Sequence, residues 1–358
     1  MALNAFTNMF RIAELRKRLM YTIALLAVYR VGIFISVPGV DRAAMNAFMD
    51  AQREAGGVVN LLNLFSGGAL EQMSIFGLGI MPYVSSSIIM QLLAVVVPTL
   101  ERLQKEGAAG RQKLNQYTRY GTIFLSVIQG IGIARWLASL GRSPSAQQAG
   151  GFDPGQVVVP SDSLWFTAMT VISLTAGTAF IMWLGERITE RGIGNGISLI
   201  IFAGIVASIP GSGKQLFDMA ASDAINVGAL VALGAFMLAL VAVVVYIERG
   251  MRRIPVQYAK RMAGRRMFAG QATYFPMKVN SAGVIPPIFA GAVLSFPATL
   301  QQWIPLLGDL NNALNQNPWI YQGVFVILVI FFTFFYVSLT FRADDVADNI
   351  KKQGGYIP

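Results

Sequence analysis

The sequence lacks two residue types on which much protein chemistry depends, since its 358 residues include no cysteine and no histidine. The absence of cysteine excludes disulfide bonds, thiolate metal sites and cysteine nucleophiles. The absence of histidine excludes Ser-His-Asp chemistry and the binding of metal or haem by imidazole. Charged residues are also scarce, at 13% of the chain, whereas soluble domains have about 25%. We therefore expect no catalytic residue, no cofactor and no bound metal.

Hydrophobic residues are abundant, at 54% of the chain, which predicts an integral membrane protein. A spanning helix needs about 20 predominantly apolar residues. Eight segments approach that length: 19–37, 75–97, 120–140, 163–184, 193–210, 225–247, 281–300 and 320–341. We expect an all-α polytopic bundle of eight spanning helices. The first segment is followed by ISVPGVD rather than by a small-residue cleavage site, so we interpret it as a retained helix.

The basic residues predict the orientation of the chain. Most of the 28 lie in alternate loops, within residues 1–18, 102–119, 187–191, 249–278 and 342–352. By the positive-inside rule these loops face the cytosol, and so do both ends of the chain. Arg30 is the one charge near the middle of an expected span, and no span contains Asp or Glu. Coupled small-solute transporters usually carry carboxylates there, so the sequence disfavours that alternative.

Residues 61–97 contain the most unusual apolar stretch. Its first part, up to about Phe76, is too short to span a bilayer and is interrupted by Gly67-Gly68. The part from Ser74 to Val97 is long enough but contains two glycines, a proline and a run of three serines, Ser85–Ser87. A half-helix leading into a weakened spanning helix is typical of membrane proteins in which irregular backbone lines a cavity. We therefore expect a gated path, with the half-helix as its stopper.

The longest cytosolic connection, residues 248–280, has eight basic residues but one acidic residue, Glu248. Two interpretations stay open: a solvated loop held against anionic lipid, or a docking surface for an acidic or polyanionic partner. Aromatic residues between the charges favour the second. We expect Arg252-Arg253 and Arg265-Arg266 at two tips. The docking residues would be Arg252, Arg253, Lys260, Arg261, Arg265 and Arg266.

Several motifs carry a family resemblance: FSGGALEQMSIFGLGIMPYVSSSIIMQLL, QYTRYGT, ERITERGIGNGISLIIFAGIV, VYIERGMRRIPVQYAKR, VNSAGVIPPIFA and VADNIKKQGGYIP. They resemble the bacterial SecY family, the channel subunit of the general secretory translocon, and the resemblance is collinear over residues 1–358. It implies a plasma-membrane channel with two pseudo-symmetric halves that open like a clam shell. It also implies ten helices, so we expect this chain to stop before the last two.

The resemblance implies a pore ring of branched aliphatic residues, namely Ile80, Val84, Ile197, Ile201 and Ile288. Within the second and fifth spans these residues are four apart and share a helical face. Such side chains would seal the channel by dewetting without binding a passing chain. The alternative is ordinary helix packing.

The resemblance also implies a plug and a lateral gate. The plug residues are Leu61, Leu64, Phe65, Ser66, Gly67, Gly68 and Leu70, and a fixed re-entrant helix is the alternative. The gate lies between the second and seventh spans, with the third behind. Its residues are Ser85, Ile88, Gln91, Gln129, Asn280 and Phe296. Hydrogen bonds between membrane helices are worth about 0.6–2 kcal/mol, weak enough for a signal sequence to displace. Simple helix adhesion is the alternative.

We divide the chain accordingly. The cytosolic segment 1–18 precedes a first half, 19–210, which contains the plug at 61–74. An external hinge loop, 211–224, leads to a second half, 225–341, which contains the docking loop 248–280. Residues 342–358 begin a further cytosolic loop.

The implied function is to pass unfolded secretory polypeptides across the membrane and to release apolar helices sideways into lipid. The implied partners are SecE, SecG, SecA or a ribosome, signal sequences as cargo, and anionic lipid. Besides the small-solute transporter, an intramembrane protease is a rival. It would need catalytic residues, and no span contains Asp or Lys.

Overall fold

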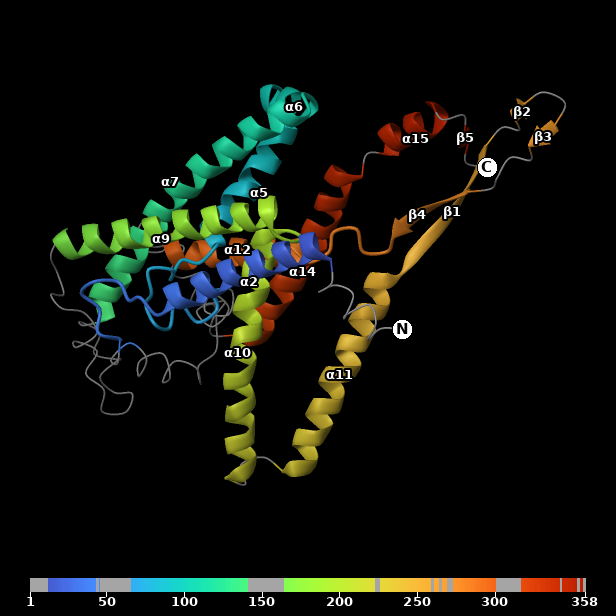
Figure 1. Ribbon diagram of the computed structural model, residues 1–358. Coiled ribbons are helices and arrows are strands. Elements are labelled where there is room, and N and C mark those ends of the chain that lie inside the picture. Colours follow the sequence, from blue (N-terminus) through green and yellow to red (C-terminus); the bar gives the residue numbers. More distant parts are fainter. Residues whose placement is uncertain are drawn as a thin grey trace. The chain divides into compact units, whose positions relative to one another are not determined.

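The computed structural model is mostly helical (Figure 1). It describes residues 12–42, 45, 66–140, 164–222, 226–258, 261–263, 266–268, 273–300, 317–341, 343–352 and 355–356. These residues fall into two compact units, one within 1–213 and 291–321 and the other within 214–290 and 322–358. The boundary at residue 213 falls inside the expected hinge, but residues 291–321 join the first unit. Each unit is described by itself.

The first unit is a bundle of helices. They are α2 (Ala13–Ile33), α5 (Met81–Val96), α6 (Pro98–Lys105), α7 (Ala108–Leu140), α9 (Leu164–Arg191) and the first part of α10 (Gly196–Ala221). Helix α7 packs against α9 and α5, and α2 packs against α9. Helices α7 and α9 both run beyond the expected apolar segments into polar sequence, because turns of helix continue outside the apolar core.

Prolines set both ends of α5. Pro82 lies in its first turn, where a missing N–H is tolerated. Val97 is extended because it precedes Pro98, so α5 ends there and α6 begins. The axes of the two helices differ by 104°. The second span was expected over 75–97, but its helix starts only at Met81.

A small core closes one end of this bundle. It joins the segment before α5 to α7 and α9 and to the chain after α2. Its buried members are Val37, Met45, Leu70, Met73, Leu78, Leu137, Phe166 and Leu174. Leu70 and Met73 belong to the region expected to act as a plug, so part of that region is firmly packed.

The expected count of eight spans is not confirmed. Within the described ranges, five helices are long and apolar enough to cross a membrane, or six if α5 and α6 form one bent span. Helix α2 is not among them, because Arg16, Lys17, Arg18 and Arg30 lower its hydropathy. The apolar part of α12, Ile285–Leu294, is shorter than a full span.

The second unit begins with a correction to the expected hinge. Helix α10 continues through Pro210 to Ala221, so most of the segment 211–224 is helical rather than a loop. Proline inside a helix removes one hydrogen bond without necessarily ending the helix. The next helix, α11 (Val227–Arg249), is capped by Asn226, whose side chain accepts a hydrogen bond from the Gly228 N–H at 3.0 Å.

The segment expected as a cytosolic loop is a β-hairpin, which corrects the purely helical expectation (Figure 1). Strand β1 (Met251–Tyr258) pairs antiparallel with β4 (Thr273–Lys278), from Met251 opposite Lys278 to Val256 opposite Thr273. Strands β2 (Arg261–Ala263) and β3 (Arg266–Phe268) pair between them. Alternating apolar residues, with Ile254 half-buried and Val256 buried, explain the strand.

The C-terminal elements are α12 (Ile285–Leu300), α14 (Pro318–Thr340), α15 (Ala343–Lys352) and β5 (Gly355–Tyr356). Strand β5 pairs with the end of β1, at Gln257 and Tyr258. Phe289 of α12 packs edge-on against Phe332 and Tyr336 of α14, with ring centroids 5.6 and 6.4 Å apart. Aromatic packing therefore joins the parts of these two helices that belong to the second unit.

Candidate functional site

The segment between Ser66 and Ile80 is a series of turns that leads into α5. The half-helix expected over 61–74 lies partly outside the described residues, and from Gly67 onward the backbone is turn rather than helix. Positive φ angles explain this correction: 67° at Gly67, 85° at Gly68 and 43° at Met73. Glycine adopts such angles readily, whereas methionine does so only under strain. We call residues 66–76 the plug segment.

Two neighbouring side chains of α2 hold the start of the plug segment. The Tyr29 hydroxyl donates to the Ser66 carbonyl at 3.0 Å. The Arg30 guanidinium donates to the Gly67 carbonyl, also at 3.0 Å. Tyr29 is buried and also stacks on Phe76, with ring centroids 5.9 Å apart. Arg30, which was expected near the middle of a span, lies in the last turn of α2 and is bonded to the plug segment.

The later part of the plug segment, residues 73–75, is held differently, by main-chain hydrogen bonds to the residues that follow α2. The Val37 N–H donates to the Met73 carbonyl, and the Ile75 N–H donates to the Ile35 carbonyl, both at 2.9 Å. The Ser74 hydroxyl adds a bond to the Gly32 carbonyl at 3.2 Å. Backbone pairs and the small core together anchor this part of the segment.

Close glycine contacts show which helices surround the plug segment. A Cβ placed on Gly67 would lie 2.7 Å from the Cα of Gly204 in α10. A Cβ on Gly79 would lie 3.3 Å from the Cα and Cβ of Ser66. On α9, a Cβ on Gly177 would overlap the Ile75 carbonyl. The start of the plug segment therefore lies directly between α10 and the residues that open α5.

Two expected pore-ring residues adjoin this position. Ile80 follows Gly79, and Ile201 lies one helical turn before Gly204 on the same face of α10. Both are buried, with 3% and 8% of their surfaces exposed, and so is Val84. The structure thus brings the expected plug beside two members of the expected ring.

The other two ring residues are placed less simply. Ile197 is half-buried, and a Cβ on Gly185 of α9 would lie 2.9 Å from its side chain. Ile197 therefore packs on α9. Ile288 is half-buried and belongs to the second unit. Leu61, Leu64 and Phe65 of the expected plug lie outside the described residues.

The expected gate residues differ in their surroundings. Ser85, Ile88 and Gln129 are buried, whereas Gln91 is exposed and donates to the Ser87 hydroxyl at 3.3 Å. Asn280 donates to Glu248 at 3.2 Å and accepts from the Gly283 N–H at 3.1 Å, all within the second unit. The side chain of Phe296 lies outside the described residues.

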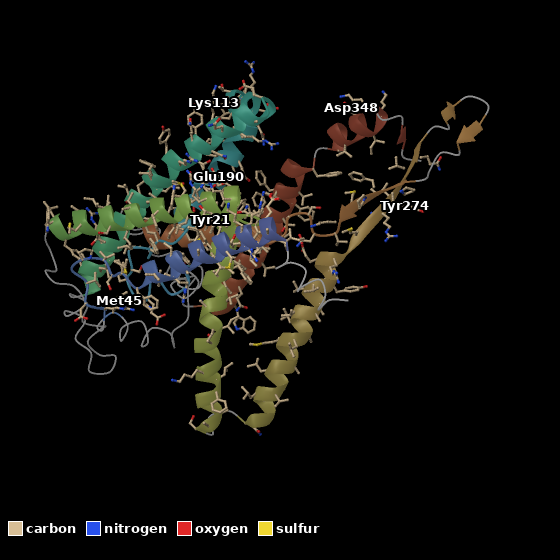
Figure 2. The ribbon with its side chains drawn as sticks, viewed as in Figure 1. Tyr21, Met45, Lys113, Glu190, Tyr274 and Asp348 are labelled. Carbon is tan, nitrogen blue, oxygen red and sulfur yellow. The ribbon has the colours of Figure 1, made fainter. Side chains whose placement is uncertain are left out.

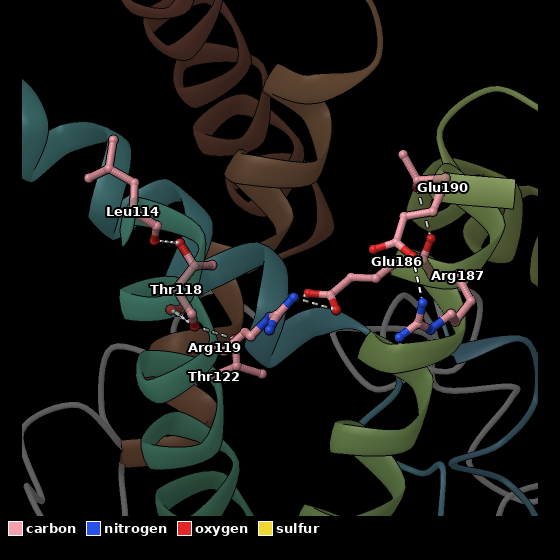
Figure 3. A network of polar contacts seen from close by, with 10 residues as sticks. Leu114, Thr118, Arg119, Thr122, Glu186, Arg187 and Glu190 are labelled. Atoms are coloured by element: carbon pink, nitrogen blue, oxygen red, sulfur yellow. Dashed lines mark hydrogen bonds and ion pairs between the residues drawn. The ribbon is translucent and has the colours of Figure 1, made fainter. Parts of the chain in front are cut away.

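Sequence reasoning missed the polar contacts that join α7 to its neighbours. The Ser86 hydroxyl of α5 donates to the Thr118 carbonyl at 2.8 Å. Arg119 forms a two-pronged pair with Glu186 of α9, at 2.7 and 2.8 Å (Figure 3). The triple serine run pointed to this region, but only the helix register distinguishes Ser86 from its neighbours. A partly exposed pair of this kind contributes at most about 1 kcal/mol.

The expected docking residues are spread over the hairpin. Arg252 and Arg253 are exposed but lie within β1 rather than at a tip, which corrects that expectation. Consecutive residues of a strand point to opposite faces, so the two arginines cannot form one patch. Tyr274 projects from β4 (Figure 2). Arg261 and Arg266 lie in β2 and β3, whereas Lys260 and Arg265 are outside the described residues.

Comparison with known proteins identifies the family. A family model described as SecY matches residues 74–358. The chain belongs to the SecY family. Curated relatives named protein translocase subunit SecY include one from Escherichia coli strain K12, 46% identical over 97% of this chain and 76% of the relative. Another, from Streptomyces scabiei, is 45% identical over 99% of this chain and 81% of the relative.

Solved structures share the fold of this SecY-family chain. One, described as a protein conducting channel, has a TM-score of 0.60 at 17% identity and covers 96% of this chain and 77% of its own. A second has a TM-score of 0.59 at 19% identity over the same shares, and its description concerns the SecY plug domain and the closed translocation channel. The expected fold class, a helical membrane bundle of SecY type, is confirmed.

Proposed function

We propose that this chain is the channel subunit of a bacterial protein translocon. It would pass unfolded secretory polypeptides across the plasma membrane and release apolar helices sideways into lipid. One observation carries the proposal: the plug segment lies between α10 and the start of α5, beside Ile80 and Ile201. A stopper beside a ring of aliphatic side chains is the arrangement expected of a channel that is closed at rest.

The ring residues suit this function chemically. Ile80, Val84 and Ile201 offer no hydrogen bond and no charge, so a passing chain of any sequence would not be retained. Branched aliphatic side chains also keep water out of a narrow opening when no chain occupies it. Ile197 and, from the second half of the chain (225–341), Ile288 would be the other members of the ring.

The signal sequence would act as both cargo and key. Its apolar helix would compete with the contacts that hold the gate shut, and Ser85, Gln129 and Asn280 would be the polar residues of that gate. Bonds of about 0.6–2 kcal/mol hold such helices together. A ligand that binds the open form more tightly shifts the equilibrium toward it. The same opening would let a sufficiently apolar segment leave sideways into lipid.

Energy and assembly would come from partners. The basic hairpin of β1 and β4 would dock SecA or a ribosome, and anionic lipid would lie against the same side of the membrane. SecE would clamp the two halves, with SecG as an accessory subunit. The distribution of basic residues supports a cytosolic N-terminus. Small-solute transport is not favoured, because the expected spans contain no carboxylate.

The deciding experiment uses the absence of native cysteine. A single cysteine replaces Ile201 in the complete protein within its membrane, and another is placed in a stalled secretory chain. We expect a disulfide that forms only when the chain carries a functional signal sequence. Phe202, exposed on the neighbouring face of α10, provides the matched control position. Translocation without a cross-link at Ile80, Ile201 or Ile288 would contradict the proposal.

A further inference from the structure

The plug segment is held unequally at its two ends. From Met73 to Ile75 it is bound by main-chain pairs to residues 35–37, and Met73 lies in the small core together with Leu70. At Ser66 and Gly67 the bonds to α2 come instead from two side chains, Tyr29 and Arg30. Main-chain pairs separate only when backbone moves, whereas a side chain can release an acceptor by changing rotamer.

The location of Arg30 calls for a partner. Arg30 lies in the last turn of α2, where a charge that is partly removed from water is costly unless it is paired or hydrogen-bonded. Arg30 is half-buried and donates to the carbonyl of Gly67. A hydrogen bond from a charged donor is stronger than a neutral one. The charge is therefore placed where it stabilises the plug segment against α10.

We propose that Tyr29 and Arg30 form a releasable latch for the plug. When the latch opens, residues 66–68 swing away from Gly204, and the anchored residues 73–75 act as the pivot. Gly68, which has a positive φ angle, lies between latch and pivot, and glycine gives the backbone the freedom to turn there. The latch sets how often the resting channel opens without cargo. This inference rests on the proposed function, because it concerns the plug of that channel.

The experiment measures how often the latched end opens at rest. Ser66, 2% exposed, becomes the single cysteine of the complete protein in its membrane complex, and its reaction rate with a maleimide is followed without cargo. The same measurement is made with Tyr29→Phe, which removes only the hydroxyl, and with Arg30→Met, which removes the donors. We expect each change to speed labelling about threefold to thirtyfold. Arg30→Lys should restore part of the protection.

Two controls separate a latch from general loosening. Tyr21→Phe removes a hydroxyl two turns earlier on α2 and should leave the labelling rate unchanged. A cysteine at Val37, 1% exposed and bonded to Met73, reports on the pivot and should stay protected in both latch variants. Unchanged labelling at Ser66 would overturn the latch. Equal acceleration at Val37 would also overturn it, because the whole segment would then be loosened.

A second variant distinguishes failure of the latch from failure of the channel proposal. Cysteines at Ser66 and Gly79 would have nearly the Cβ separation of a disulfide, since a Cβ on Gly79 lies 3.3 Å from that of Ser66. Oxidation should lock the plug and stop translocation, and reduction should restore it. Continued translocation in the oxidised state would contradict the plug itself. A block combined with unchanged labelling in the latch variants would overturn the latch alone.

Discussion

At the scale of single residues, two adjacent positions, 67 and 68, disfavour a side chain for different reasons. Gly67 and Gly68 both have positive φ, 67° and 85°. Gly67 also lies against Gly204, so a side chain there has no room, whereas a Cβ on Gly68 would meet nothing within 4 Å. Backbone strain acts at both positions, and steric exclusion acts only at Gly67. The pair therefore allows the two effects to be separated.

We expect Gly67→Ala to destabilise the closed plug more than Gly68→Ala. Both changes introduce strain of about 1–3 kcal/mol, and only Gly67→Ala also pushes the plug segment away from α10. Protection of the Ser66 position against a thiol reagent gives the measurement, with Gly68→Ala as the matched control. Equal effects of the two substitutions would show that the approach to Gly204 does not matter.

At the scale of elements, α10 presents two different surfaces through consecutive residues. Ile200 is 2% exposed and lies near Gly185 of α9, since a Cβ there would be 3.6 Å from its side chain. Ile201 is 8% exposed and shares a face with Gly204, which meets the plug segment. One residue holds the bundle together, and the next faces the proposed path.

We expect Ile201→Asn and Ile200→Asn to have different effects, the first on selection of cargo and the second on stability. Burying an amide costs about 1–3 kcal/mol at either site. At Ile201 the substitution should weaken the seal, so that a reporter with a defective signal sequence crosses about tenfold more readily. At Ile200 it should lower the thermal stability of the complex without relaxing selection. Relaxed selection with Ile200→Asn, or unchanged selection with Ile201→Asn, would count against the ring.

The elements also show what the sequence could predict. Apolar length located most long helices, and the interrupted stretch before Pro82 correctly indicated irregular backbone there. The length of α5 could not be predicted, because its start depends on tertiary contacts such as those of Gly79 with Ser66. The partner of Arg30 could not be predicted either, since the acceptor is a main-chain carbonyl 37 positions later. The hairpin was missed because its basic residues obscured the alternation of Ile254 and Val256.

At the scale of the whole molecule, the apolar helices and the basic hairpin present different kinds of surface. Helices α11 and α14 expose apolar side chains over most of their length, which suits lipid or partner helices. The β1–β4 hairpin instead combines charge with a half-buried apolar face. Arg253 shares its face with Lys278, whereas Arg252 shares the other with Ile254.

We expect the two arginines of β1 to contribute unequally to partner binding. Arg253→Glu should weaken binding of a polyanionic partner, because it alters the face that also carries Lys278. It should also reduce the magnitude of the slope of log affinity against log salt by about one or more. Arg252→Glu on the opposite face is the matched control and should change the slope less. Binding measured across a salt series gives both slopes. Identical slopes for the two variants would contradict the prediction that the partner binds mainly the face with Arg253.

The bonds from α2 to the plug have a consequence for sequence tolerance. Tyr29 and Arg30 bind carbonyl oxygens, which every amino acid provides, and neither bond uses a side chain of the plug. These two bonds therefore depend on the position of the plug backbone and not on which side chains the plug carries. A plug with a different sequence would therefore still be held by Tyr29 and Arg30, provided that glycine at positions 67 and 68 preserved the turn.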